Sequence, residues 1–262
     1  MLILINMIKT KTSEEIKILA EGGKKLSEVL SVLRDKVKAG MNSTELENLA
    51  KKLIKEAGAE PAFLGYRSHG GKPYPAALCI SVGSAVVHTP ASIPYEIKPG
   101  DVVSLDLGLT YKGLCTDMAT TVIVSPADKK TQQLSNTTRE ALEAAILECR
   151  AGAPISNIGK RVEDIVKKAG FSIVKELVGH GVGYEVHEDP AVPNYFTKAS
   201  ERDIMKEGLV IAIEPMVSMG SGRIKLGEDN ITYETIDGSL AAHFEATVAI
   251  TKEGPIVLTP VI

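Results

Sequence analysis

Acidic side chains stand inside apolar, strand-like stretches at four places along this chain. The stretches read VVSLDLGLTY, LCTDMATTVIV, LVIAIEPMV and LAAHFEATVAI, and a histidine lies in a further glycine-rich stretch. In chain order, these residues of metal-ligand type are Asp106, Asp117, His180, Glu214 and Glu245. Charged groups are costly to bury unless they are paired, hydrogen-bonded or bound to metal. The chain must therefore fold so that these side chains find a shared partner, and a common metal centre would supply one.

The first two carboxylates can be placed by strand geometry. If Lys112 and Gly113 form the two-residue turn of a hairpin, Asp106 faces Ala119 across the ladder. Asp117 precedes Ala119 by two residues, so it lies on the same face as Asp106. The two carboxylates should therefore converge.

Four carboxylates and one imidazole form a hard, oxygen-rich ligand set that suits divalent Mn, Fe, Co or Zn. Their negative charge exceeds what one ion would neutralise, so we expect two divalent metal ions, which in such sites lie roughly 3.5 to 4 Å apart. Taken alone, Asp106 could be an acid beside a turn, Glu214 a charge at a strand end and His180 a hydrogen-bonded loop histidine. Together, inside apolar strands, the five residues favour an enzyme.

Length and charge bound the class of protein. A chain of 262 residues can form one large domain or two small ones, and it buries roughly three quarters of its extended surface. A net charge of −3 without a block of basic residues gives no electrostatic case for nucleic-acid or membrane binding. The three cysteines are odd in number and set in apolar sequence, which indicates a reducing compartment. The first apolar run is too short for a signal peptide or membrane span, so we expect a cytoplasmic protein.

Periodicity predicts a repeated order of helices and strands. Capping-box spacing at Thr12 and Asn42 starts two helices, which should end near Gly40 and Gly58. Two more helical stretches cover about 128–150 and 155–169. Beyond the hairpin, strands are predicted at 79–82, from 171 onward, and at 208–218, 224–235 and 240–251.

This order, helix, helix, strands and then the same again, indicates an α+β fold. We expect two similar halves around one mixed, mostly antiparallel sheet, with helices packed on one side. No linker divides the chain, so residues 1–262 should form a single catalytic domain. Residues 1–6 precede a second methionine, Met7, and are either an edge strand or a non-native extension of a domain that spans 7–262.

Short motifs carry a likeness to a known family. They are VVHTP at His88, SLDLG at Asp106, TDMA at Asp117, GHGVGYEVHEDP at His180 and His187, IEPM at Glu214 and FEAT at Glu245. From Met7 to the C-terminus the chain resembles the type I methionine aminopeptidases, metallopeptidases of the pita-bread fold. The resemblance implies an enzyme that removes the initiator methionine from nascent proteins when the next residue is small. It also implies a monomer that meets nascent chains transiently near the ribosome exit.

The resemblance assigns roles to the metal-ligand residues. Asp106 would chelate one ion, and Asp117 and Glu245 would bridge both. His180 and Glu214 would complete the coordination of the other ion. Glu214 would also hold the attacking water and act as general base. Metal coordination lowers the pKa of water to roughly 7, which suits peptide hydrolysis at neutral pH.

Two further histidines would contact the substrate at the scissile peptide bond and its neighbours. The resemblance assigns this role to His88 and His187, and an imidazole is suited to donate a proton to the leaving amine. Without the resemblance, His88 reads as an ordinary histidine of a loop, and His187 as a histidine of a loop or a helix start.

A methionine side chain is long, apolar and polarisable, so aromatic and sulfur groups should line its pocket. The positions that match the family's pocket are Phe63, Tyr66, Tyr74 and Cys79. Val186 and Ile231 stand where relatives often have aromatic residues, so the metal chemistry is better supported than the selectivity for methionine. The stretch 67–73 resembles an insertion beside the pocket and is predicted to form its rim or a lid.

Two positions near the last glutamate depart from the family pattern. Ala246 stands where the family usually has histidine, and His243 where it tends to have glutamine. By strand alternation His243 shares a face with Glu245, so it is a candidate to support a metal ligand or to add one. The alternative is a histidine on the surface of a strand.

Two other functions stay open. A proline-specific relative of the same fold, an Xaa-Pro aminopeptidase or prolidase, usually carries an extra N-terminal domain, whereas this chain begins its sheet domain almost at once. A non-catalytic protein of this fold that binds ribosomes or nascent chains would be expected to have lost metal ligands, and all five are present here. Peptide cleavage with and without added metal separates these functions from the aminopeptidase.

Overall fold

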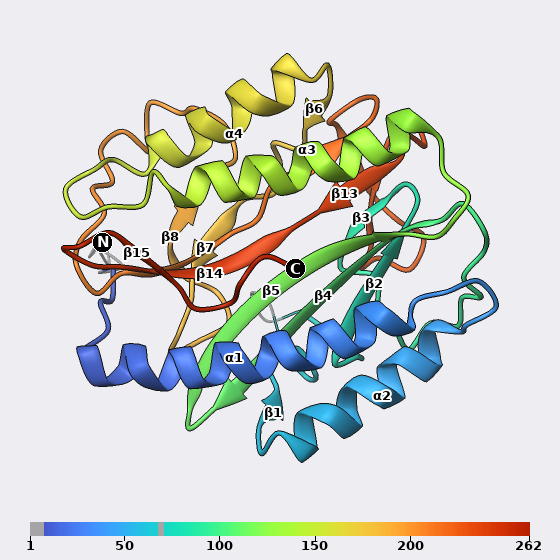
Figure 1. The fold of residues 1–262 in the computed structure, drawn as a ribbon, viewed down its shortest axis with the longest axis horizontal. Coiled ribbons are helices and arrows are strands. Elements are labelled where there is room, and N and C mark those ends of the chain that lie inside the picture. Colours follow the sequence, from blue (N-terminus) through green and yellow to red (C-terminus); the bar gives the residue numbers. More distant parts are fainter. Residues whose placement is uncertain (1–7, 68–70) are drawn as a thin grey trace.

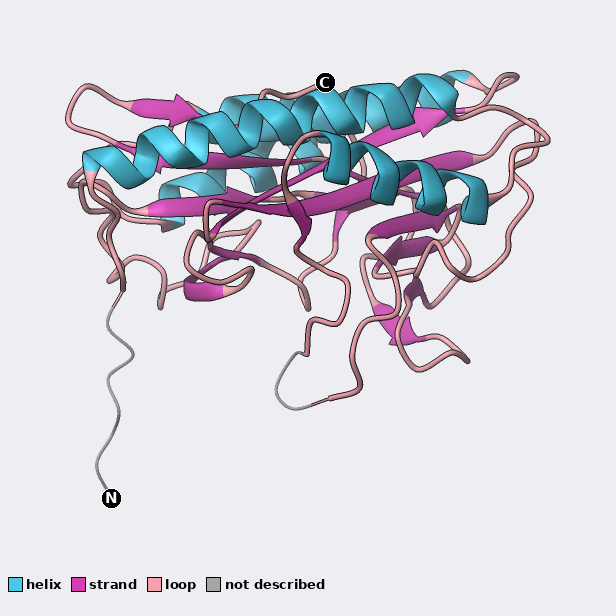
Figure 2. Cartoon of the chain, turned by 90° about the horizontal axis from the view of Figure 1, so that it is seen from below, coloured by secondary structure: helices cyan, strands magenta, loops and turns pink. Residues whose placement is uncertain are grey.

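Helices cover one face of a large β-sheet. The computed structural model describes residues 8–67 and 71–262, so the expectation for residues 1–6 lies outside the described range. Within it, the helices are α1 (Ser13–Lys36), α2 (Ser43–Glu56), α3 (Lys129–Ile146) and α4 (Ser156–Lys168). Figure 1 shows them in front of the sheet, and Figure 2 shows that loops and short strands project from the opposite side. The predicted helices and their one-sided packing are confirmed.

The first two helices begin where the capping signals place them. Thr12 accepts the N–H of Glu15 through its side chain, and the Glu15 carboxylate accepts the N–H of Thr12. Asn42 and Glu45 form the same capping box at α2. Each pair satisfies N–H groups that the first helical turn leaves without partners. Each of the four helices ends slightly earlier than the periodicity suggests, and α1 ends because Val37 is already extended.

Among the described residues, the largest sheet has nine strands and runs through both halves of the chain. In spatial order its strands are β1 (Glu60–Pro61), β4 (Val102–Tyr111), β5 (Leu114–Ile123), β14 (Glu245–Ile250), β9 (Val210–Ile213), β7 (Gly179–Gly181) and β8 (Glu188–Val192), with β2 (Leu78–Val82) beside β4 and β15 (Pro255–Val257) beside β14. The pairings between these strands are antiparallel. The chain reverses between neighbouring strands, as expected for a mostly antiparallel sheet.

Two smaller sheets flank the large one, and the strands of the first of them contact α3 and α4. One contains β13 (Ala241–His243), β10 (Met216–Ser218) and β6 (Ser172–Ile173). The other contains β11 (Ile224–Leu226), β12 (Tyr233–Thr235) and β3 (Ala85–Val87). Figure 2 shows short strands and loops below the large sheet, on the side away from the helices.

The predicted hairpin of β4 and β5 is confirmed residue by residue. Lys112 and Gly113 have φ values of 49° and 80°, the positive values that a type I′ turn requires. Asp106 pairs with Ala119 across the ladder, as expected. On its other side β5 pairs with β14, where Glu245 faces the same Ala119. The carboxylates of Asp106, Asp117 and Glu245 are thus placed on neighbouring strands by the strand register alone.

The strands predicted at 208–218 and 240–251 are each broken in two, which corrects the expectation of continuous strands. β9 ends before Glu214 and Pro215, and β10 begins after them. Proline has no N–H to donate, so the ladder cannot pass through Pro215 unchanged. The second break falls at Phe244, between β13 and β14. Since β9 pairs with β14 and β10 with β13, both breaks lie where the chain passes between the large sheet and a small one.

Separate hydrophobic cores fill the space under the two helix pairs. Under α1 and α2 the core includes Leu30 and Leu105, and under α3 and α4 it includes Leu142 and Ile211. All four side chains are fully buried. The β5–β14 pairing joins the halves into one sheet, so the seam between them is a strand pair. Among the described helices, none is both long and apolar enough to cross a bilayer.

Candidate metal centre and substrate cavity

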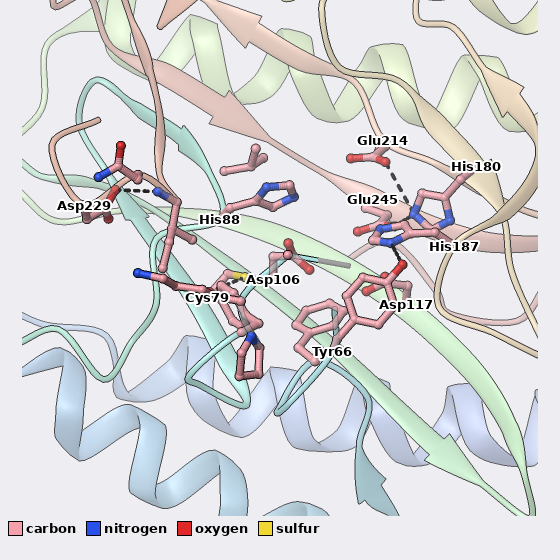
Figure 3. A pocket seen from close by; sticks show the side chains of 18 residues that line it. Tyr66, Cys79, His88, Asp106, Asp117, His180, His187, Glu214, Asp229 and Glu245 are labelled. Carbon is pink, nitrogen blue, oxygen red and sulfur yellow. Dashed lines mark hydrogen bonds and ion pairs between the residues drawn. The ribbon is translucent and has the colours of Figure 1, made fainter. Parts of the chain in front are cut away.

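The five predicted metal-ligand residues come together at the seam between the halves. Asp106 and Asp117 lie on β4 and β5, and His180 lies on β7. Glu214 directly follows β9, and Glu245 is the first residue of β14. All five line one cavity of about 520 Å³. Figure 3 shows their side chains directed toward a common space.

Three of these residues already have the geometry of a metal site. Asp117, His180 and Glu245 each offer a ligand atom, and these atoms lie within 4.8 Å of one another. His180 Nε2 lies 3.6 Å from Glu214 Oε1 and 4.0 Å from Glu245 Oε1 (Figure 3). Carboxylate oxygens and a neutral imidazole are the donors that divalent transition metals and zinc accept.

One oxygen of each carboxylate from the first half and the seam has no hydrogen-bond partner among the described residues. Among the described residues, Asp106 Oδ1, Asp117 Oδ1 and Glu245 Oε1 are buried oxygens without a hydrogen-bond partner. Burial, followed by the charge of Asp117 and then Glu214, raises the pKa of Asp106 and of Glu245 well above the ordinary value. Burial and the charge of Glu214 raise the pKa of Asp117 to about 8. Clustered buried carboxyls of this kind fit divalent cations, which would neutralise them.

Glu214 differs from the other carboxylates because imidazoles surround it. Burial raises the pKa of Glu214, but the side-chain interaction with His243 and the charges of His180, His243 and His187 outweigh it and leave the pKa below the ordinary value. His243 is buried, and its Nε2 lies 3.3 Å from Glu214 Oε2. The alternative of a surface histidine at this position is therefore wrong.

The two predicted substrate histidines lie on opposite sides of the metal-ligand cluster. His88 follows β3 with φ 66°, a left-handed conformation that is uncommon for a residue with a side chain and often marks functional sites. Its ring meets the edge of Tyr233, with centroids 5.7 Å apart, and burial lowers its pKa. His187 precedes β8; its ring centroid lies 4.4 Å from that of His180, and its Nδ1 lies 2.8 Å from the hydroxyl of Tyr66 (Figure 3).

The predicted pocket residues line the same cavity. Phe63 and Tyr74 pack edge to face with centroids 6.4 Å apart, and the Tyr74 hydroxyl lies 2.9 Å from Cys79 Sγ. With Tyr66, these side chains form an aromatic and sulfur-containing wall. Of the two positions that lack an aromatic, Ile231 lines the cavity and Val186 is buried in the neighbouring core.

Sequence reasoning missed several residues of the cavity rim. Gly71, Lys72 and Pro73 line the cavity, which agrees with the predicted rim, although His69 of that stretch lies outside the described residues. The missed rim residues include Asp229 and Asn230. Asp229 accepts the N–H groups of Ile231 and Thr232, and Asn230 has φ 59°. The sequence EDN after Gly227 indicates this turn but does not indicate that it reaches the site.

Comparisons with known proteins agree with this geometry. The model of metallopeptidase family M24 matches residues 17–252. A methionine aminopeptidase of Aquifex aeolicus is 41% identical over 254 residues, which are 96% of this chain and 98% of that protein. The crystal structure of a methionine aminopeptidase from Thermotoga maritima superposes with a TM-score of 0.90 at 38% identity, over 97% of this chain and 99% of that one. A prolidase from Pyrococcus furiosus superposes with a TM-score of 0.76 at 27% identity, over 96% of this chain and 65% of that one. The pita-bread fold is therefore confirmed, and the chain belongs to metallopeptidase family M24 and, within it, to the methionine aminopeptidases.

Proposed function

We propose that the chain removes the N-terminal methionine from polypeptides whose second residue is small. One observation carries this proposal: five metal-ligand side chains and two histidines line the same cavity as an aromatic and sulfur-containing wall. A reactive centre and a pocket for a long, polarisable side chain are thus adjacent. The methionine aminopeptidases to which the chain is similar support the same activity.

The metal-ligand residues would hold two divalent ions. These residues are Asp106, Asp117, His180, Glu214 and Glu245. The buried oxygens without partners and the raised pKa values of three carboxyls support this assignment, while the identity of the metal, Co, Mn, Fe or Zn, stays open. When bound, such ions lower the pKa of a coordinated water and polarise the scissile carbonyl.

Glu214 is the residue proposed to take the proton of the attacking water. Its lowered pKa keeps it ionised at neutral pH, whereas Asp106, Asp117 and Glu245 are pushed toward the protonated form in the absence of cations. We assign His243 to hold Glu214 in place through Oε2, which leaves Oε1 directed toward His180.

His187 and His88 are proposed to bind the substrate at its reacting bond. His187 is exposed at the cavity mouth and is oriented by the Tyr66 hydroxyl, so it can donate a proton to the amine that leaves. His88 keeps a lowered pKa because it is buried, so it is neutral at physiological pH and can hydrogen-bond the peptide backbone.

Phe63, Tyr66, Tyr74 and Cys79 are proposed to contact the methionine side chain. Flexible thioether chains interact favourably with aromatic edges and faces, and these residues supply both. The wall is apolar enough to exclude charged first residues.

The biological substrate on this proposal is the N-terminal methionine of nascent polypeptides, met transiently near the ribosome exit in the cytoplasm. The chain would act as a monomer with one catalytic domain across 7–262, and the β5–β14 pairing across the seam supports a single unit. Sedimentation with and without ribosomes carrying nascent chains tests the association. Gel filtration with light scattering tests the oligomeric state.

Cleavage of matched peptides tests the function. Chelator-treated protein is assayed on Met-Ala-Ser, Met-Lys-Ser and Ala-Pro-Ser, with and without Mn, Fe, Co or Zn. Metal-dependent release of methionine from Met-Ala-Ser, with little from Met-Lys-Ser, is expected. Cleavage only before proline would assign the chain to the prolidase type, and no cleavage with any metal would favour a binding role.

A further inference from the structure

A buried ion pair joins the N-terminal segment to the residue that follows His187. Lys11 Nζ lies 2.6 Å from Glu188 Oε2, and the two side chains are 0% and 4% exposed. The partners are 177 positions apart in sequence. The proposed chemistry uses neither of them, so their burial needs another reason.

The segment 8–12, here termed the N-terminal strap, is fixed to both halves of the molecule. The Lys11 N–H donates to the Gly208 carbonyl at 2.6 Å, just before β9, and Ile8 packs against the core of the second half. Immediately after the strap, α1 packs on β4 and β5 of the first half. The Tyr184 hydroxyl donates to Glu15 Oε1, within the capping box of α1, at 2.9 Å. The strap therefore has a defined position relative to the seam.

The loop 183–188, here termed the histidine loop, closes on the carboxylate of Glu188. Glu188 Oε1 accepts the N–H groups of Tyr184 and Glu185, while Oε2 accepts from Lys11. The Lys11 ammonium also lies 5.0 Å from the centroid of the Tyr184 ring. Gly183 has φ 141°, a conformation that residues with a side chain rarely adopt, and the end of the Lys11 side chain passes directly against it. The ammonium thus lies against the loop that ends at His187 and Glu188.

Stability alone does not account for this arrangement. Taking two charges out of water carries a desolvation penalty that can exceed the gain from their attraction, and apolar pairs of similar volume are often as stable or more so. An apolar pair could not accept the two loop N–H groups or fix the direction of the carboxylate. His187 directly precedes Glu188, and it is an exposed loop residue whose ring lies beside those of His180 and Tyr66.

We propose that Lys11 is a positioning residue for His187: through its buried ion pair with Glu188, the N-terminal strap holds the histidine loop at the cavity mouth. This inference rests on the proposed function only in that His187 acts on the substrate. Small displacements of a proton donor reduce turnover much more than they reduce substrate binding, since the donated hydrogen bond matters most in the transition state.

Steady-state kinetics on Met-Ala-Ser test the proposal with three variants of the full chain. Lys11→Met keeps the length of the side chain without the ammonium, and it should lower kcat about tenfold or more while KM changes by less than about threefold. Lys11→Arg should recover most of the lost kcat. Lys9→Met is the matched control, because Lys9 is exposed and lies 5.8 Å from the same Tyr184 ring; it should stay within about twofold of the parent protein.

A second readout does not depend on activity. The chain has five histidines, so the ring Cε1–H signals of the metal-free protein can be assigned one by one by substitution. The His187 signal should shift or broaden in Lys11→Met but not in Lys9→Met, while that of His243 stays in place. If Lys11→Met does not fold, Glu188→Gln, which keeps the shape of the side chain, should show the same loss of kcat and the same change in the His187 signal.

A folded Lys11→Met protein with parental kcat and an unchanged His187 signal would overturn the proposal. A uniform fall in the melting temperature and in the active fraction, with kcat per active site unchanged and the His187 signal in place, would also overturn it, since the ion pair would then be structural only. If the parent protein releases no methionine while the His187 signal still moves in Lys11→Met, the proposed function fails and the positioning role of Lys11 stands.

Discussion

The two halves of the molecule contribute unlike side chains to the same centre. The first half supplies Asp106 and Asp117 from a regular hairpin, and burial raises the pKa of both. The second half supplies His180 and Glu214, where neighbouring imidazoles outweigh the effect of burial and lower the pKa of Glu214. The aspartates of the first half therefore need bound cations to stay ionised, whereas Glu214 of the second half stays ionised without them. We infer that the first half mainly determines metal affinity, and that the imidazole-rich side mainly determines turnover.

The largest effect on activity should come from the first half, whose two aspartates form the acid-rich side of the centre. Asp117→Asn keeps the shape of the side chain but removes the charge, so metal binding should weaken and metal-dependent hydrolysis should fall by on the order of a thousandfold. The metal-free variant should fold, because the substitution removes a buried carboxyl whose pKa is raised. Isothermal titration with Mn and the rate of methionine release measure the two quantities.

Asp101→Asn is the matched control for that experiment. Asp101 lies just before β4, accepts hydrogen bonds from Tyr95 and from the Lys98 N–H, and does not belong to the cavity lining. The Asp101→Asn substitution should leave metal affinity unchanged. Parental metal affinity and hydrolysis in Asp117→Asn would remove this residue from the ligand set.

On the imidazole-rich side, His187→Ala should separate turnover from metal binding. Loss of a positioned proton donor should lower kcat by about a hundredfold, the lower end of what general acid–base catalysis contributes. Metal affinity should change little, because His187 lies beside His180 without belonging to the buried carboxylate cluster. Turnover and metal titration on the same preparation provide the comparison, and an equal loss in both would contradict the division between the halves.

The same division explains which parts of the site the sequence could predict. The hairpin follows local rules, since the turn at Lys112 and Gly113 fixes the register and the register places Asp106 opposite Ala119. The second half depends on strand breaks. Pro215 signals one of them, but Phe244 carries no local signal, and the break there reflects the pairing of β13 with β10 in another sheet.

Contacts between distant segments could not be predicted from the sequence, for a related reason. The bond between Tyr66 and His187 spans 121 positions, and the ion pair between Lys11 and Glu188 spans 177. Both join loops or termini whose paths are set by the packing of the two halves rather than by periodicity. Residue types predicted the metal chemistry well, because buried carboxylates require a partner wherever they lie. The orientation of the histidines required the fold.

A pH titration of the metal-free protein sharpens the comparison further. The pKa of Asp117 rises from 3.8 to about 8 on folding, so between these pH values the folded state binds more protons than the unfolded state. Stability of the metal-free protein should therefore fall as pH rises through this window. Between pH 6 and pH 8 we expect the melting temperature to drop by about 4 °C, or roughly 1–2 kcal/mol for a chain of this size.

Metal ions should reverse this trend, and a substitution should flatten it. Mn added at pH 8 should raise the melting temperature more than at pH 6, because binding no longer competes with protons. Metal-free Asp117→Asn should show a weaker dependence on pH than the parent protein. A parent melting temperature that rises from pH 6 to pH 8 without metal would contradict the protonated state assigned to the acid-rich side.

The smallest effect should come from Tyr66→Phe, which removes the hydroxyl through which the first half reaches His187. The hydrogen bond spans 2.8 Å and joins the halves across the cavity mouth. Its loss should lower kcat/KM about fivefold, the equivalent of about 1 kcal/mol for one neutral hydrogen bond. The ring that is proposed to face the methionine side chain is kept, so KM should change less than kcat. Tyr95→Phe, which removes a hydroxyl bonded to Asp101 outside the cavity, is the control. If His187 is held only from the second half, Tyr66→Phe will match this control; a fivefold loss would show that the imidazole-rich side requires both halves.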